Sequence, residues 1–200
     1  MNIYDLIIIG GGPAGMSAAL YAARRSMHFV LLTADIGGQL LTTPDVENYP
    51  GIDFVTGPEL ARKMYEQIKK AGAEVVPHVY IASIVKDADG YVIGSTRGEY
   101  RARKLILAFG RTPKKLEVVG EDKEGVAHAV IDSEDYQGKV VVVIGGGNSA
   151  LDAAQVLGDR AKKVYSIHRR DSLRGESVEV EKVMGDDRIG LAHPQRARAV

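Results

Sequence analysis

The sequence predicts an α/β protein, and two observations lead to that fold class. A thirteen-residue pattern occurs twice, at residues 7–19 (IIIGGGPAGMSAA) and 135 positions further on at residues 142–154 (VVIGGGNSALDAA). Each copy joins a β-branched run to three glycines and then to small and apolar residues at helical spacing, as in a strand, a tight turn and a helix. Two such copies in one chain indicate two Rossmann-like, three-layer dinucleotide-binding domains.

Each copy begins a predicted βαβ unit. The uninterrupted apolar runs are typical of strands that a parallel sheet buries on both faces. After the first copy, the pattern predicts a helix up to Arg25 and a strand at residues 28–33. After the second copy, it predicts a helix up to about Leu157 and a strand at residues 163–168. Each unit then has the roughly 25 to 30 residues expected of a dinucleotide-binding half.

The region between the two copies predicts a loop, a helix and several short strands. Residues 36–57 are rich in Gly, Pro, Thr and Asn and predict a loop. Residues 58–71 begin with Pro58 and carry an apolar stripe at helical spacing, which predicts a helix. The tail from Gly185 to Val200 has no clear periodicity. Strands are expected at residues 74–76, 80–86, 91–95, 99–103 and 104–108.

Composition narrows the possible functions. The 26 Lys and Arg residues balance 26 Asp and Glu residues, so nothing favours nucleic acid or an anionic membrane as a partner. No apolar run reaches the roughly 20 residues that span a bilayer, and the first residues lack the pattern of a signal peptide, so we expect a cytoplasmic protein. The five His residues stand singly, which predicts no metal site. The absence of Cys excludes disulfides and cysteine nucleophiles within these residues.

The first glycine turn has the pattern Gly10-x-Gly12-x-x-Gly15. Gly10 allows a sharp turn out of the strand, Gly12 lets the backbone approach a pyrophosphate, and Gly15 lets the helix pack close to the strand. The phosphates would lie on the exposed amides and positive dipole of the helix N-terminus. Because the turn follows a predicted strand and begins a helix, we expect nucleotide binding rather than a merely structural turn.

The second glycine turn, Gly145-x-Gly147-x-x-Ala150, is the permitted variant with Ala at the packing position. Asn148 and Ser149 would either bond a phosphate or cap the helix, and the sequence leaves both roles open.

The residues that end the second strand of each unit select the nucleotide. Thr33 and Asp35 of the first unit correspond to His168 and Arg170 of the second. Asp35 would bond a ribose hydroxyl, whereas forked guanidinium hydrogen bonds fit a 2′-phosphate. A solvated basic loop is the alternative. The basic cluster of the second unit consists of His168, Arg169, Arg170 and Arg174.

The two units therefore predict one dinucleotide without a 2′-phosphate and one nucleotide of the NADP type. FAD with NADPH is the economical pair, because a flavin can take a hydride and pass electrons on.

Six segments resemble the low-molecular-weight thioredoxin reductases, which are class II pyridine nucleotide-disulfide oxidoreductases, and their ferredoxin/flavodoxin–NADP reductase relatives. They keep the family's order over most of residues 1–184, although the family usually shows Thr at Phe109. The segments are IIIGGGPAG (7–15), GGQL (37–40), VENYPG (46–51), LILAFG (105–110), VIGGGNSA (143–150) and HRRDSLR (168–174).

The resemblance implies an FAD-binding domain at residues 1–112, a linker or hinge at residues 113–124 and an NADPH-binding domain at residues 125–200. The implied flavin-side residues, beside Thr33 and Asp35, are Gly10, Gly12, Pro13, Ala14 and Gly15 at the pyrophosphate, Gly38, Gln39 and Asn48 near the isoalloxazine or ribityl chain, and Ala108 and Gly110 at a strand end. The implied NADPH-side residues, beside His168, are Gly145, Gly147, Asn148, Ser149 and Ala150 at the phosphates, and Arg169, Arg170 and Arg174 at the 2′-phosphate.

Two departures from the family change the expected activity. Thioredoxin reductases carry a Cys-x-x-Cys pair shortly before the second glycine turn, where this sequence has GVAHAVIDS (125–133) and no cysteine. Without thiols a flavin cannot reduce an internal disulfide. The same stretch resembles the ferredoxin/flavodoxin reductase branch, whereas VENYPG resembles the thioredoxin reductase branch, and we weight the missing cysteines more. The family also returns to its flavin domain, and we expect a C-terminally truncated member that lacks this part.

Two functions remain. The first is an FAD-dependent NADPH oxidoreductase that passes electrons to an external acceptor (ferredoxin, flavodoxin or a disulfide protein), with no catalytic side chain. The second is a non-catalytic remnant that only binds nucleotides. Bleaching of a bound flavin by NADPH without oxygen distinguishes them. The resemblance also implies a homodimer.

Overall fold

The computed structural model describes residues 3–111, 116–128, 130 and 133–192. The chain divides into two compact units, Met1–Pro113 and Lys114–Val200, which we call the N-terminal and C-terminal units. Both are α/β, which confirms the predicted fold class.

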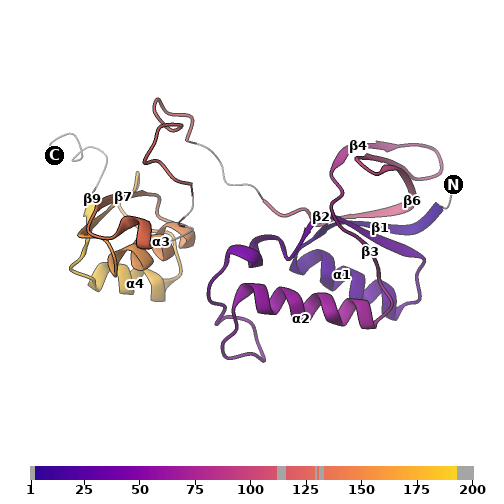
Figure 1. The fold of residues 1–200 in the computed structure, drawn as a ribbon, viewed down its shortest axis with the longest axis horizontal. Helices are drawn as coiled ribbons and strands as arrows, with labels where there is room; N and C mark the ends of the chain where they lie inside the picture. Colours follow the sequence, from indigo (N-terminus) through magenta and orange to yellow (C-terminus); the bar gives the residue numbers. More distant parts are fainter. Residues whose placement is uncertain (1–2, 112–115, 129, 131–132, 193–200) are drawn as a thin grey trace. The chain divides into compact units, whose positions relative to one another are not determined.

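The N-terminal unit is built on a six-stranded sheet with the strand order β3-β2-β1-β6-β5-β4 (Figure 1). Strands β3, β2, β1 and β6 run parallel, and β6, β5 and β4 form an antiparallel meander. The elements are β1 (Ile3–Gly11), α1 (Pro13–Arg24), β2 (Phe29–Ile36), the 3₁₀ helix η1 (Gly38–Thr42), α2 (Gly57–Lys70), β3 (Glu74–Val76), β4 (Ile81–Lys86), β5 (Tyr91–Ser95) and β6 (Gly98–Leu107).

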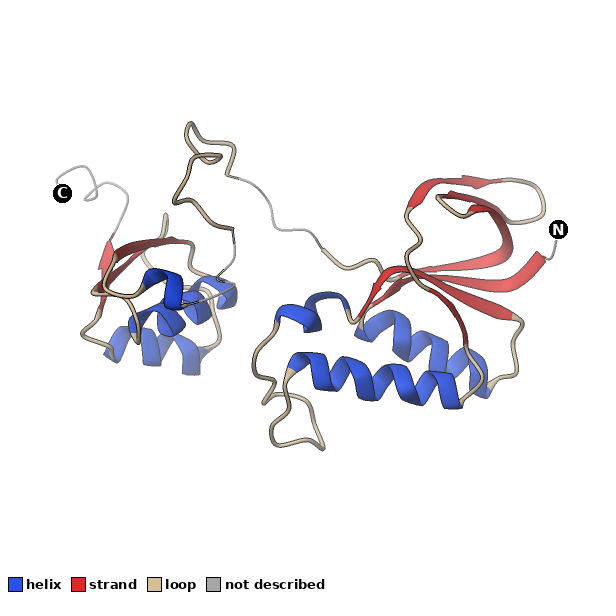
Figure 2. Ribbon diagram, in the orientation of Figure 1, coloured by secondary structure: helices blue, strands red, loops and turns tan. Residues whose placement is uncertain are grey.

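Strand β1 lies at the centre of this sheet and is buried on both faces, as its apolar run predicts. Ile7 pairs with Val30 of β2 on one edge and with Leu105 of β6 on the other. Helices α1 and α2 cover one face (Figure 2), where Ile8 joins a cluster with Met16. On the opposite face, Ile7 packs in a second cluster with residues of β2, β5 and β6.

The C-terminal unit has a three-stranded parallel sheet with the order β7-β8-β9. Helices α3 and α4 pack on one face of it, around the buried Leu151, Val164 and Val183 (Figure 2). The elements are η2 (Glu134–Tyr136), β7 (Val140–Ile144), α3 (Asn148–Gly158), β8 (Lys163–Ile167), α4 (Ser177–Gly185) and β9 (Ile189–Ala192).

Burial of β7 on both faces was predicted and is wrong. Val140, Val142 and Ile144 are 59%, 51% and 60% exposed, and only the alternate residues point toward the helices. The reason is that β7 is an edge strand whose second face carries no helix in the described part of the chain.

Three further differences concern secondary structure. The predicted strands at residues 99–103 and 104–108 are one strand, β6, which pairs with β5 in its first half and with β1 in its second. The 3₁₀ helix η1 lies within the expected loop 36–57. Strand β9 lies in the tail for which the sequence predicted no element. Its four residues are too few to show a periodic pattern. Residues 193–200 lie outside the described residues.

None of the helices in the described ranges is long and apolar enough to cross a membrane.

Candidate functional site

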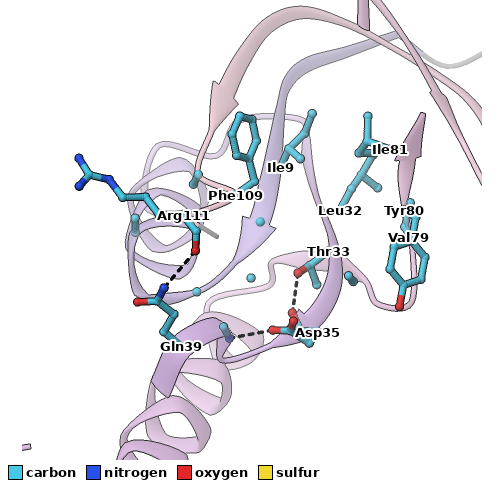
Figure 3. A pocket seen from close by; sticks show the side chains of 18 of the residues that line it. Ile9, Leu32, Thr33, Asp35, Gln39, Val79, Tyr80, Ile81, Phe109 and Arg111 are labelled. Atoms are coloured by element: carbon cyan, nitrogen blue, oxygen red, sulfur yellow. Dashed lines mark hydrogen bonds between the residues drawn. The ribbon is translucent and has the colours of Figure 1, made fainter. Parts of the chain in front are cut away.

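A pocket of about 780 Å³ opens at the carboxyl ends of β1, β2 and β6 in the N-terminal unit (Figure 3). Ligand sites in doubly wound sheets lie at this end of the strands, and the volume is in the usual range for ligand pockets. The pocket is lined by Ile9, Gly10, Gly11, Gly12, Pro13, Ala14, Leu32, Thr33, Ala34, Asp35, Gly38, Gln39, Val79, Tyr80, Ile81, Ala82, Ser83, Ile84, Ala108, Phe109, Gly110 and Arg111.

The first glycine turn lines this pocket, and tight steric constraints act on it. Gly10 has a φ of +114°, and a Cβ on it would overlap the carbonyl oxygen of Ala108. A Cβ on Gly15 would overlap the carbonyl oxygen of Gly10. Both positions therefore require glycine, one for its left-handed backbone and the other for close packing of the helix on the strand.

The N-terminus of α1 is open toward the pocket. Its N-cap is Gly12, which has no side chain to accept the first amide hydrogen bonds, and a Cβ there would come no closer than 4.0 Å to the Gly37 carbonyl oxygen. By contrast, α2 is capped by its own residue Thr56, whose hydroxyl accepts from the Glu59 amide. The free amides and the helix dipole of α1 thus fit a phosphate group.

One hydrogen bond fastens the loop after β2 to this turn, and two more brace the end of β2 and the loop. The Gly37 amide donates to the Gly11 carbonyl over 2.9 Å. The Asp35 carboxylate accepts from the Gly38 amide over 2.8 Å, and the Thr33 hydroxyl donates to the Asp35 carbonyl. The Asp35 side chain thereby stays at the pocket edge, where a ribose hydroxyl would meet it.

Ten of the twelve candidate flavin-side residues line the pocket together. The exceptions are Gly15, which packs beneath the turn, and Asn48, which is exposed in the loop before α2. The structure thus brings together residues from the ends of three strands and from η1, where Gln39 donates to the Arg111 carbonyl over 3.1 Å.

Sequence reasoning missed one wall of the pocket, the segment from Val79 to Ile84. The Val79 amide donates to the Thr33 carbonyl over 3.0 Å, which fixes this segment to the end of β2. Figure 3 also places the rings of Tyr80 and Phe109 at the pocket, where they are 64% and 68% exposed. The only hint of these residues in the sequence was that Phe109 departs from the family pattern. The segment from Val79 to Ile84 gave no such hint, because the sequence of a strand does not tell which other strand it will lie beside.

The second glycine turn repeats this geometry in the C-terminal unit. Gly145 has a φ of +150°, and a Cβ on it would lie 2.8 Å from the Cβ of Ala150. Gly147 is the N-cap of α3, no side chain caps that helix, and no other atom of the described residues lies within 4 Å of the place a Cβ would take on it. Asn148 and Ser149 are exposed at the helix start. This helix N-terminus also fits a phosphate.

The loop after β8 is bonded to the second turn. The His168 ring packs against the backbone of Gly146, where a Cβ would meet it. The Arg174 amide donates to the Gly146 carbonyl over 2.6 Å. The Glu176 amide donates to the Asn148 side-chain oxygen over 2.8 Å, and the Asn148 side-chain amide donates to the Glu176 carboxylate over 3.3 Å.

The arginines of this loop are exposed and available to an anion. Arg169, Arg170 and Arg174 form no salt bridge with any residue of the described segments. Guanidinium groups beside an open helix N-terminus suit a ligand with more than one phosphate.

Two carboxylates, Asp152 of α3 and Glu179 of α4, have shifted pKa values. Burial, followed by the charges of Glu179 and Glu176, raises the pKa of Asp152. The hydrogen bond from Gln155, followed by that from Lys182, lowers the pKa of Glu179. The bond from Gln155 to Glu179 joins α3 to α4.

Comparison with known proteins gives a consistent result. Residues 4–188 match the family described as pyridine nucleotide-disulphide oxidoreductase. The thioredoxin reductase of Bacillus subtilis is 41% identical over 193 residues, which cover 94% of this chain and 61% of that protein. The thioredoxin reductase of Listeria monocytogenes is 37% identical, with 94% and 60% covered. The chain thus spans about 60% of the length of the curated relatives it matches.

Solved structures agree with this match. The thioredoxin reductase of Lactococcus lactis has a TM-score of 0.89 at 35% identity, over 95% of this chain and 64% of that one. The thioredoxin reductase of T. acidophilum has a TM-score of 0.84 at 32% identity, over 96% and 64%.

Proposed function

Because the chain belongs to the pyridine nucleotide-disulphide oxidoreductase family, we propose that it is a flavin-dependent NADPH oxidoreductase. Residues 1–112 bind FAD in this proposal, residues 125–200 bind NADPH, and residues 113–124 connect them. Bound FAD would supply a hydride acceptor that can release electrons to another molecule. One observation carries the proposal: two turns of the same pattern leave a helix N-terminus open, yet only the second has a loop of exposed arginines beside it.

The N-terminal unit binds and orients the flavin nucleotide. The first-turn amides of α1 hold its pyrophosphate, and Asp35 accepts a hydrogen bond from the adenosine ribose. The other half of the dinucleotide then extends toward Gly38, Gln39 and the segment from Ala108 to Arg111, which line the same pocket. These groups position the cofactor, so no acid–base side chain is required.

The C-terminal unit binds NADPH by the same turn with a different loop. The amides that follow Gly147 hold the pyrophosphate, and Arg169, Arg170 and Arg174 bond the 2′-phosphate. An NADH molecule lacks that phosphate and would leave the arginines without their ligand, which is the proposed basis of selectivity.

The electron acceptor in this proposal is a separate molecule. These 200 residues contain no cysteine, so reduced flavin cannot pass electrons to a thiol pair within them. A small electron-carrier protein such as a ferredoxin or flavodoxin, or a disulfide protein, would receive the electrons. We also propose a homodimer, which sedimentation of the purified chain would test.

The test is the visible absorption spectrum of the purified chain with added FAD, recorded before and after anaerobic NADPH. We expect a bound-flavin spectrum that NADPH bleaches. A bound flavin that NADPH leaves unchanged would contradict the reductase and support a protein that only binds nucleotides. A chain that takes up no FAD would contradict the flavin site itself.

A further inference from the structure

The side chain of Asn148 ties the second glycine turn to the far end of the arginine loop. Its oxygen accepts from the Glu176 amide over 2.8 Å, and its amide donates to the Glu176 carboxylate over 3.3 Å. We call this pair of bonds the Asn148–Glu176 clasp. Gly175 allows it, because a Cβ there would lie 3.0 Å from the Asn148 oxygen and would overlap Leu151.

The clasp holds the end of the arginine loop, and other contacts with Gly146 hold the rest of it. His168 packs on Gly146 at the beginning, the Arg174 amide reaches the Gly146 carbonyl, and Glu176 ends the loop at Asn148. Between these anchors lie Arg169 and Arg170, whose side chains are exposed. A loop fixed at both ends presents its arginines with less entropy to lose when an anion binds.

From these contacts we infer that Asn148 is a positioning residue for recognition of the 2′-phosphate. Its backbone amide stays available at the start of α3, while its side chain holds the arginine loop against the turn that binds the pyrophosphate. It does not cap α3, because the N-cap of that helix is Gly147 and no side-chain cap bond is formed, and its partner Glu176 is the N-cap residue of α4. The inference rests on the proposed NADPH site, and it adds that selectivity for the 2′-phosphate depends on a residue that does not touch it.

The main experiment compares Asn148→Ala with the unaltered chain by isothermal titration of 2′,5′-ADP and of 5′-AMP. Both probes share the adenosine and one phosphate, and only 2′,5′-ADP carries the 2′-phosphate. We expect the ratio of the two affinities to fall about tenfold in Asn148→Ala, the effect of about one lost charged hydrogen bond. A purely structural role would weaken both probes equally and leave the ratio unchanged.

A graded series separates the two bonds of the clasp. Glu176→Gln keeps the backbone amide and a side-chain acceptor, so the affinity ratio should stay within about twofold of the unaltered value. Glu176→Ala keeps only the shorter bond to the backbone and should give an intermediate ratio. Gln155→Ala is the matched control, because Gln155 forms a similar amide–carboxylate bond from α3 to Glu179 away from the turn. It should leave the ratio unchanged.

A second readout needs no nucleotide. Trypsin cleaves after Arg, and the loop contains Arg169, Arg170 and Arg174. Release of the clasp should speed cleavage at these positions about fivefold in Asn148→Ala and not in Gln155→Ala, as expected for loss of about 1 kcal/mol of local stability.

The outcomes separate the inference from the proposed function. An unaltered chain that binds 2′,5′-ADP no better than 5′-AMP would overturn the NADPH site and the inference with it. An unaltered chain that prefers 2′,5′-ADP, together with an unchanged preference in Asn148→Ala, would overturn the inference alone. Faster proteolysis and a reduced preference that occur together in Asn148→Ala would support it.

Discussion

The two glycine turns have the same backbone design, and the loops beside them differ. In each, a residue close to the end of the second strand lies against the middle glycine: Thr33 of β2 against Gly11, and His168, just after β8, against Gly146. In each, the carbonyl of that middle glycine accepts a hydrogen bond from a backbone amide of the loop that follows the second strand. The first loop is held by its own Asp35, whereas the second is held by a residue of the turn. In the proposed function the repeated pattern holds the phosphates, and the loop beside it selects the nucleotide.

The strands before these turns differ more than their sequences suggest. Ile7 is fully buried, and its equivalent in the repeat, Val142, is 51% exposed. Strand β1 has a neighbour on each edge and a cluster on each face, but β7 is an edge strand with one covered face. An apolar run thus reports strand formation, and the rest of the fold determines how much of the strand is buried.

The largest expected difference between the two units concerns the packing position of the turn. Gly15→Ala places a Cβ on the Gly10 carbonyl, so the helix must move away from the strand, at a cost on the order of 4 kcal/mol in unfolding free energy. The reverse change in the second unit, Ala150→Gly, should cost about 1 kcal/mol through helix propensity alone. Flavin content and unit-resolved hydrogen exchange measure both effects. A Gly15→Ala chain with normal flavin content would show that the turns tolerate the same residue.

The next largest difference concerns the strands. Ile7→Ala removes a fully buried side chain and should destabilise the N-terminal unit by about 3 kcal/mol. Val142→Ala, at the equivalent position, should cost about 1 kcal/mol or less in the C-terminal unit because half of the side chain is already exposed. Hydrogen exchange of the two units gives the comparison. Equal losses in both units would mean that the outer face of β7 is covered in solution.

The third prediction concerns the nucleotides. Replacement of Arg169 and Arg170 by Ala should weaken NADPH by about 1.5–3 kcal/mol for each charged hydrogen bond lost, and should spare NADH. Flavin retention in the N-terminal unit should not change. Titration of both nucleotides against the double variant provides the measurement, and equal weakening of NADPH and NADH would refute the assignment of these arginines to the 2′-phosphate.

The smallest expected effect is a dependence of the stability of the C-terminal unit on pH. The Arg188 side chain, followed by its backbone amide, lowers the pKa of Asp186. A lowered pKa adds stability above the ordinary pKa of the carboxyl group, and this stability is lost as the pH falls through about 4 and below. The network is partly exposed, so the loss should stay under about 1 kcal/mol. Urea unfolding at pH 5 and pH 3 tests this, with Asp186→Asn as the variant that should lose the Asp186 contribution and keep that of Glu179, whose pKa is also lowered.

The sequence predicted those parts of the molecule whose structure is determined by residues close together in the chain. Both glycine turns, their strands and their helices follow from residues close together in the chain, and the arginine loop follows from the repeat offset. The wall at Val79 was not predictable, because it depends on pairing with β2 across more than forty residues. The clasp was not predictable either, since Asn148 and Glu176 meet only when the loop after β8 folds back.

Strand β1 needs a partner that is made much later than itself. Ile7 pairs with Leu105, so the central strand acquires its second neighbour only after the whole meander has been synthesised. The strands of the C-terminal unit instead follow one another in spatial order, β7, β8 and β9. Distant pairing slows folding, and short-range pairing speeds it. During translation the sheet that carries the first glycine turn therefore stays incomplete for longer, and its Ile-rich first strand is exposed to other chains until β6 leaves the ribosome.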